Sequence, residues 1–142
     1  MNISQESDYA LRAIRAMYNF GVENKIEARI ISEKEHIPIR FLFKILRKLC
    51  AENIIESFRG VNGGYMLKAP LEKLTLNDII EAIEGPISIN KCTKDKNLCE
   101  ICLSGCSLYY EMKKVENEIL NILSRKSLKE ILDSSIDGIN FF

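Results

Sequence analysis

The sequence predicts a mainly α-helical fold with one β-hairpin, and three observations lead to this expectation. Apolar residues recur at helical spacing in several separate segments. In the middle of the chain the spacing changes, and two short strand-like runs flank a glycine-rich tip. Toward the C-terminus a longer apolar stripe indicates a helix of about five turns. The length, 142 residues, fits one domain with an added dimerisation element.

Three helices are expected before the hairpin. Ser7 or Asp8 can cap the first, which extends to about Phe20, and a second short helix covers residues 27–36. Pro38 suits the first turn of the third helix, because its missing N–H would be unpaired there anyway. This third helix runs to about residue 52 and leaves its basic side chains largely outward. They are Arg40, Lys44, Arg47 and Lys48.

Turn and capping residues indicate the hairpin and the remaining helices. Strands over 54–58 and 65–68 flank the tip Asn62-Gly63-Gly64, whose glycines can supply positive φ. Thr75 begins a fourth helix that ends before Gly85-Pro86, and Ser127 with Glu130 begins a last short helix. Between these two helices lies the long stripe, formed by Leu108, Met112, Val115, Ile119, Ile122 and Leu123.

The net charge is zero, but the middle of the chain is basic. Residues 34–73 carry eight basic and four acidic side chains, a net charge of +4, whereas the segments before and after have net charges of −1 and −3. A basic patch is typical of a surface that faces phosphates. Two short helices, a basic helix and a hairpin, in this order, predict a winged helix-turn-helix that binds double-stranded DNA. The alternative is a small α+β domain whose basic helix and hairpin only face water.

Four of the five cysteines lie in one charged stretch, CTKDKNLCEICLSGC, residues 92–106. The N-terminus lacks a signal-peptide pattern and no apolar run is long enough to span a membrane, so we expect a cytoplasmic protein with reduced thiols. Clustered thiolates bind soft metals. An iron–sulfur cluster is the first interpretation, because cysteines on flexible loops hold such clusters. Zinc is the second, since only one C-x-x-C pair is present, and a redox dithiol at Cys99 and Cys102 is the third.

Three longer stretches precede these cysteines: SDYALRAI, PIRFLFKILRKLCAENIIESFRGVNGGYMLKAP and LTLNDIIEAIEG. Together with the cysteines they resemble the Rrf-two family of bacterial transcription regulators. Members of this family include an iron–sulfur cluster regulator, a nitric-oxide-sensing repressor and a cysteine-metabolism regulator. The match covers nearly the whole chain, and its most specific parts are ESFRGVNGGYML and the cysteines just after the fourth helix. The resemblance implies a homodimer joined by the long C-terminal helix and an operator with two related half-sites.

The resemblance also implies which residues contact DNA. Arg59 matches the wing arginine that enters the minor groove, and Gly63 and Gly64 let the tip approach the phosphates. Outward on the recognition helix lie Arg40, Lys44 and Arg47. Phe43 departs from the family, which often has a polar or acidic side chain there that can hydrogen-bond a base. A phenylalanine can contact a thymine methyl group, or it can pack against the wing or the first helix.

The cluster ligands that the resemblance implies are Cys92, Cys99 and Cys106, spaced evenly as Cys-x6-Cys-x6-Cys. A cluster generally takes four protein ligands. The iron–sulfur cluster regulator uses a histidine after its third cysteine, and this chain has none there. Two candidates for the fourth ligand remain, Cys102 and Asp8, the latter supplied by the partner subunit as in the nitric-oxide-sensing relative. Such ligand sets fit a 4Fe–4S or a 2Fe–2S cluster.

We therefore expect a DNA-binding domain over 1–85, a cysteine-rich cluster-binding loop over 86–107, and a dimerisation helix with a C-terminal segment over 108–142. The expected function is a sequence-specific regulator of transcription, a repressor, whose DNA affinity depends on a cluster that senses redox state, nitric oxide or iron–sulfur status. No P-loop, Rossmann fingerprint or catalytic constellation occurs, so no enzyme is expected. The alternatives are a cluster-free regulator that responds to thiol stress or a small molecule, and a zinc-stapled protein-interaction module.

Overall fold

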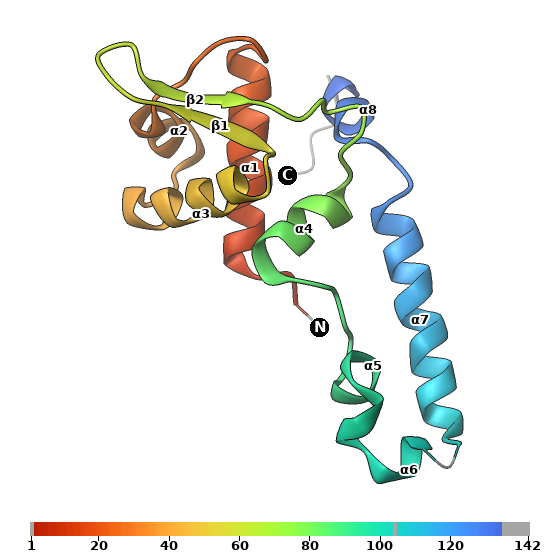
Figure 1. Ribbon diagram of the computed structural model, residues 1–142. Coiled ribbons are helices and arrows are strands. Elements are labelled where there is room, and N and C mark those ends of the chain that lie inside the picture. Colours follow the sequence, from red (N-terminus) through yellow and green to blue (C-terminus); the bar gives the residue numbers. More distant parts are fainter. Residues whose placement is uncertain (1, 104, 135–142) are drawn as a thin grey trace.

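The computed structural model describes residues 2–103 and 105–134, without the side chains of residues 102 and 103. In chain order its elements are α1 (Gln5–Phe20), α2 (Ala28–Glu35), α3 (Ile39–Ala51), β1 (Ile55–Phe58), β2 (Gly64–Leu67), α4 (Leu76–Glu84), α5 (Lys91–Lys94), the 3-10 turn η1 (Lys96–Leu98), α6 (Glu100–Leu103), α7 (Ser107–Leu123) and α8 (Leu128–Asp133). Figure 1 shows a head, formed by α1 to α4, the hairpin and α8, and an arm in which α5, η1 and α6 lie beside α7. The mainly helical fold with one hairpin is confirmed.

The first helix begins earlier than the sequence suggested. Its N-cap is Ser4, whose hydroxyl accepts a hydrogen bond from the Ser7 N–H at 3.2 Å. The prediction of Ser7 or Asp8 as the cap is therefore wrong. Ser7 is fully buried, and its hydroxyl donates to the Glu84 carboxylate at the end of α4. A polar residue of the first turn thus joins α1 to α4, which sequence periodicity could not reveal.

The other helix ends follow their capping residues. Reciprocal capping boxes begin α4, with Thr75 and Asp78, and α8, with Ser127 and Glu130, as predicted. His36 ends α2 in the left-handed conformation, with φ of 52°, and is exposed. It is a turn residue between α2 and α3.

The core lies between α1 and the helices that pack on it, α2, α3 and α4. The buried face of α3 consists of Leu42, Ile45, Leu46 and Leu49, each fully buried. Each such side chain contributes roughly 1.5–3 kcal/mol of hydrophobic stabilisation. Because apolar residues occupy this face, the basic residues of α3 are left on the opposite one.

The hairpin is fastened to the head near its turn end. Its strands pair antiparallel, with Phe58 opposite Gly64 at the turn end. Ile26, in the connection between α1 and α2, exchanges two backbone hydrogen bonds with Tyr65, at 2.9 and 2.8 Å. These bonds hold the hairpin beside α3, in the place of a wing (Figure 1).

The chain leaves the head through α5, η1 and α6, and the long helix α7 runs back from the end of the arm to the head, where α8 packs (Figure 1). The Leu128 N–H donates to the Leu74 carbonyl at 2.7 Å, and Leu128 is buried in the head. The apolar stripe of α7 is divided between two faces. Leu108, Val115 and Ile122 are 74%, 48% and 61% exposed, whereas Met112, Ile119 and Leu123 are half-buried. Within the described residues, none of the helices has both the length and the apolar character to cross a membrane.

Candidate DNA-binding surface and cysteine segment

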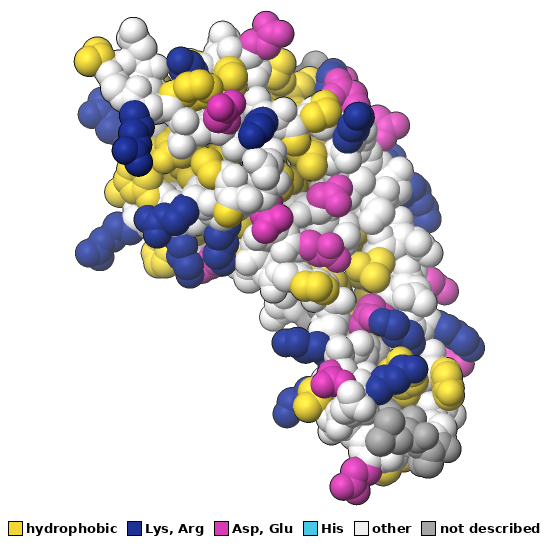
Figure 2. All heavy atoms as spheres, in the orientation of Figure 1, with side chains coloured by type: hydrophobic (Ala, Val, Ile, Leu, Met, Phe, Trp, Pro, Cys, Tyr) yellow, Lys and Arg dark blue, Asp and Glu magenta, His cyan; other side chains and the backbone are white. Residues whose placement is uncertain are grey.

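The outward face of α3 carries the side chains predicted to contact DNA. Arg40, Lys44 and Arg47 are exposed there, opposite the buried leucines. Figure 2 shows Lys and Arg side chains gathered on the side of the molecule where α3 and the hairpin lie. Lys48 differs from the prediction, because it is half-buried and takes part in contacts between helices. Three basic side chains of α3 are therefore exposed, whereas the fourth, Lys48, bonds to other helices of the head.

The wing places one more cation beside this face. Arg59 is exposed at the turn of the hairpin, next to Gly60 with φ of +98°. At Gly63 and Gly64 a side chain would clash with the backbone of the protein itself. A Cβ at Gly63 would lie 2.5 Å from the Phe58 carbonyl oxygen, and Gly64, with φ of +151°, would place one 2.8 Å from the Ile26 carbonyl oxygen. Their approach to phosphates stays a prediction, whereas the structure requires glycine at Gly63 for the tight turn and at Gly64 for the close approach of the Ile26 backbone.

A shallow groove separates α3 from the wing. It has a volume of about 440 Å³ and is lined by Phe43, Arg47, Cys50, Ser57, Arg59 and Tyr65. Phe43 is 47% exposed, so its ring borders the wing and also faces solvent. Both interpretations of this residue, contact with a thymine methyl group and packing against the wing, stay open. The groove brings Phe43 and the two arginines onto one surface.

A polar junction connects α1, α3 and the end of α4. Lys44 and Lys48 both donate to the Glu6 carboxylate, and Lys48 also donates to the Ile83 carbonyl at 3.0 Å. The two lysines hold the pKa of Glu6 below its ordinary value. Glu84 accepts from the Ser4 N–H at 2.9 Å at the same end of α4. Helix α3 is thus bonded to the last turn of α4, the helix that leads into the cysteine segment.

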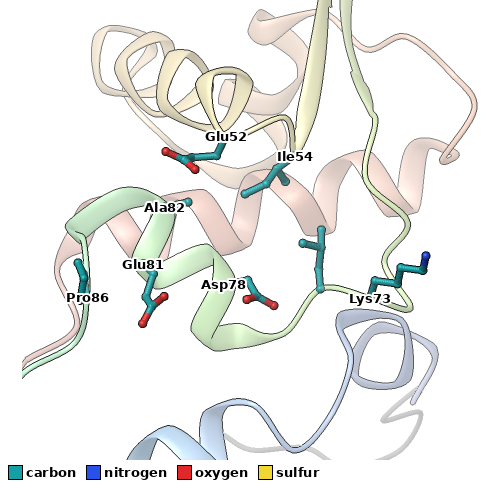
Figure 3. Close-up of a pocket in the computed structure, with 8 residues that line it drawn as sticks. Glu52, Ile54, Lys73, Asp78, Glu81, Ala82 and Pro86 are labelled. Atoms are coloured by element: carbon teal, nitrogen blue, oxygen red, sulfur yellow. The ribbon is translucent and has the colours of Figure 1, made fainter.

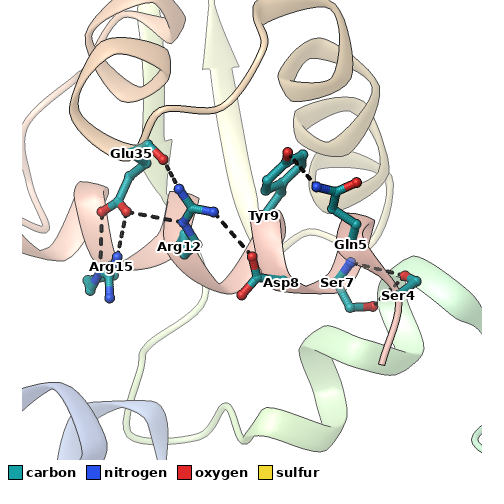
Figure 4. A network of polar contacts seen from close by, with 8 residues as sticks. All are labelled: Ser4, Gln5, Ser7, Asp8, Tyr9, Arg12, Arg15 and Glu35. Carbon is teal, nitrogen blue, oxygen red and sulfur yellow. Dashed lines mark hydrogen bonds and ion pairs between the residues drawn. The ribbon is translucent and has the colours of Figure 1, made fainter. Parts of the chain in front are cut away.

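Asp8, a candidate cluster ligand, lies on the exposed side of α1 (Figure 4). Its carboxylate pairs with Arg12 at 3.2 Å and its side chain is 58% exposed. Arg12 also donates to the Glu35 carbonyl, and Arg15 pairs with the Glu35 carboxylate at 2.5 Å. Exposure leaves Asp8 accessible to a partner subunit, and Arg12 would compete for its charge.

The cysteines lie on the arm, and the predicted flexible loop consists of short helical turns. Cys92 is in α5, Cys99 lies between η1 and α6, and Cys106 is the N-cap of α7. These three are half-buried, and Cys102 has its side chain outside the described residues. Thiols on one segment are suitable ligands for an iron–sulfur cluster. Across the part of the chain that the structure describes, three or more potential ligands are nowhere gathered around one point.

The fifth cysteine belongs to the head. Cys50 is half-buried against the core. Burial raises the pKa of its thiol. It is therefore a poor nucleophile and no part of the cysteine segment.

Sequence reasoning missed a buried carboxylate, Glu116 on α7. It is 1% exposed and accepts a hydrogen bond from the Ile89 N–H at 3.0 Å. Burial acts to raise its pKa, but hydrogen bonds from Lys113, Thr93 and Ile89 hold that pKa below the ordinary value. The sequence contains a signal for it, because Glu116 falls in the helical row of Met112, Ile119 and Leu123. An acidic residue in an apolar row indicates a buried polar partner.

One further cavity, of about 420 Å³, lies where the end of α3 meets α4 and the loop before it (Figure 3). It is lined by Glu52, Ile54, Lys73, Leu74, Asp78, Glu81, Ala82 and Pro86. Three carboxylates make it unsuitable for a phosphate backbone. One of them, Asp78, is engaged in the capping box of α4. The cavity thus borders α4 and is separate from the basic face of α3.

Comparison with known proteins agrees with this geometry. A family model described as Rrf2, iron-dependent transcriptional regulator, matches residues 3–134. The Bacillus subtilis protein YwgB, provisionally named an HTH-type transcriptional regulator, is 26% identical over 136 residues, which are 94% of this chain and 85% of that protein. The structure of CymR (YrzC), described as the global cysteine regulator of B. subtilis, has a TM-score of 0.72 at 19% identity and covers 95% of this chain and 98% of its own.

IscR from T. potens has a TM-score of 0.71 at 19% identity, and the match covers 99% of this chain and 93% of that one. At this identity the two solved structures show a common fold. The family model extends over the head, the cysteine segment, α7 and α8. The protein therefore belongs to the Rrf2 family of transcriptional regulators, whose members are not enzymes and whose function implies DNA as a partner.

Proposed function

We propose that this protein is a dimeric, sequence-specific repressor whose affinity for operator DNA is controlled by an iron–sulfur cluster. The observation that carries the proposal is the continuous connection between two surfaces. The basic face of α3, with Arg59 of the wing beside it, suits DNA. Lys48 connects α3 to the end of α4 through the Ile83 carbonyl, and the cysteine segment follows directly.

Cys92, Cys99 and Cys106 would hold the cluster, with Asp8 of the partner subunit or Cys102 as the fourth ligand. A bound 4Fe–4S or 2Fe–2S cluster would supply a metal centre that reacts with oxidants or nitric oxide. Shared ligation would fix the segment between α4 and α7 in one conformation. When the three cysteines no longer share a metal, the segment would change shape, and α4 and α3 would follow it.

Dimerisation would convert this local change into a change in affinity. The exposed residues Leu108, Val115 and Ile122 repeat every seven residues, which is the spacing of a helix–helix seam. Two chains joined along α7 would present two recognition helices at one separation. Because both half-sites must be met at a fixed spacing, a small rotation of one head would weaken specific binding.

Replacing Arg59 with alanine is expected to weaken operator binding. The lost contact, to the minor groove or to phosphate, corresponds to about 1–3 kcal/mol, or roughly a fivefold to 150-fold increase in Kd. The slope of the logarithm of the binding constant against the logarithm of the salt concentration should become shallower by about one. The measurement is fluorescence anisotropy with a duplex that the wild-type protein has enriched from a random pool, at several salt concentrations.

The matched control is Arg125→Ala, because Arg125 is also exposed but lies after α7, far along the chain from the wing. It should bind the same duplex as the wild type does. Equal affinity of Arg59→Ala and wild type would remove the wing from the proposed interface.

Replacing Glu6 with glutamine is expected to strengthen binding to DNA of any sequence. Glu6 neutralises Lys44 and Lys48, so its removal leaves two cations available beside the basic face. We expect roughly a threefold to tenfold lower Kd for a random duplex at low salt, and a smaller gain at high salt. Glu111→Gln is the control, since it breaks a comparable exposed pair with Lys114 on α7. An unchanged Kd would show that Glu6 does not restrain these lysines.

A second candidate function has a specific observation in its favour. Among the described residues the cysteines are not gathered around one point, and CymR, which has the same fold, is described as a cysteine regulator. A cluster-free regulator that responds to thiols or to a small molecule would keep the same DNA-binding surface. A zinc-stapled module is the remaining alternative for the cysteines. Metal and sulfide analysis separates these possibilities from the cluster.

A further inference from the structure

Glu116 is unusual because it is a charged side chain buried at the centre of α7. Only 1% of its surface is exposed, whereas its neighbours in the sequence, Val115 and Asn117, are exposed. Carboxylates are seldom buried unless specific partners receive them. The hydrogen-bond partners of Glu116 therefore indicate which segment this side chain binds.

The partners of Glu116 come from the segment that precedes the cysteines. The Ile89 N–H donates to Oε2 at 3.0 Å, and the Thr93 hydroxyl, which donates to the Asn90 carbonyl at 3.1 Å, helps to hold the pKa of Glu116 below its ordinary value. Lys113, one turn earlier on α7, pairs with Oε1 and neutralises the charge. One carboxylate thus connects α7 to two positions of a segment that is remote in sequence.

These two positions enclose Cys92. Between them Asn90 caps α5, accepting a hydrogen bond from the Thr93 N–H at 2.9 Å. The capped turn of α5 is four residues long, too short to be stable alone. The bonds to Glu116 attach this turn to α7, the helix whose N-cap is Cys106.

We propose that Glu116 is a positioning residue that fastens the turn carrying Cys92 to α7. The place of Cys92 relative to Cys106 and to the exposed face of α7 then depends on one side chain. The proposal deepens the proposed function, because it names the contact through which the cysteine segment and α7 move together. The fastening itself does not require a cluster.

The test measures the accessibility of Cys92 in the reduced, metal-free full-length protein. Wild type, Glu116→Ala, Glu116→Gln and the exposed control Glu118→Ala are treated with iodoacetamide, and peptide mass spectrometry gives the rate for each cysteine. Cys50, in the head, serves as the internal reference. We expect Glu116→Ala to raise the rate at Cys92 relative to Cys50 by roughly fivefold or more, because the turn opens more often. Glu118→Ala should match the wild type.

Glu116→Gln separates positioning from a general loss of structure. Its amide oxygen can still accept the bond from Ile89, so the Cys92 rate should lie close to that of the wild type. Circular dichroism and melting curves check that each variant is folded. An unchanged Cys92 rate in a folded Glu116→Ala, or an increase of equal size at Cys50, would overturn the proposal.

Metal analysis of the same variants keeps the two proposals apart. If the wild type binds iron and sulfide after anaerobic reconstitution, Glu116→Ala should retain less than half as much, and Glu118→Ala should retain all of it. If the wild type binds no cluster, the proposed cofactor is wrong, whereas the alkylation rates still decide the role of Glu116.

Discussion

The Cys99→Ala variant is expected to contain neither iron nor acid-labile sulfide. Wild-type protein purified without oxygen should be brown and contain iron and sulfide in equal amounts. Removing the middle thiolate of the proposed ligands Cys92, Cys99 and Cys106 would leave too few ligands to retain a cluster. The fold of the head should survive, because Cys99 lies on the arm, away from the core. The measurement is iron, zinc and sulfide content together with the visible spectrum.

Cys50→Ala is the matched control, since Cys50 is a half-buried thiol of the head and should not affect metal content. Zinc without sulfide in the wild type would identify a structural zinc site. Colourless, metal-free wild type would favour the cluster-free regulator. If the cluster is present, Cys102→Ala and Asp8→Ala decide which side chain is the fourth ligand.

The fold could be predicted from local signals, because its elements depend on residues close in sequence. The capping boxes at Thr75 and Ser127 fix where α4 and α8 begin, and the glycines of the wing fix its turn. The exposed cations of α3 could also be predicted, since the leucines of the same helix define its buried face. These features require only periodicity and capping chemistry.

The residues that connect the elements could not be predicted in this way. Ser7, Lys48 and Glu116 each bond to a partner between 27 and 77 positions away in the sequence. A helical pattern says which side of a helix is apolar, but it does not say which polar residue finds a distant acceptor. The helical pattern therefore predicts an outward Lys48, although its ammonium group donates hydrogen bonds to Glu6 and to the Ile83 carbonyl.

The apolar stripe of α7 shows the same limit. Sequence spacing assigned Leu108, Met112 and Val115 to a single face. In the structure Met112 turns toward its own chain, while Leu108 and Val115 are exposed. Which apolar side chains of α7 are buried within the single chain depends on the position of α5 beside α7. The exposed ones form the candidate dimer seam, whose role stays a prediction.

Replacing Val115 with lysine is expected to dissociate the proposed dimer. Val115 lies at the middle of the exposed row and is 48% exposed in the single chain. In a symmetric seam each substitution occurs twice, so two unpaired charges would be buried together. Burying an unpaired charge costs several kcal/mol, which would raise the dimer Kd by roughly a thousandfold or more. Light scattering after size-exclusion chromatography, at micromolar concentration, measures the mass directly.

Val22→Lys is the matched control, because Val22 is 46% exposed and lies in the connection between α1 and α2, away from α7. It should leave the mass unchanged. The monomeric Val115→Lys should also lose at least about a hundredfold in operator affinity, since one head meets only one half-site. Its affinity for random DNA should fall much less, because each basic face is intact. A variant that stays dimeric would place the interface elsewhere, and one that becomes monomeric without losing operator affinity would contradict the fixed spacing of two recognition helices.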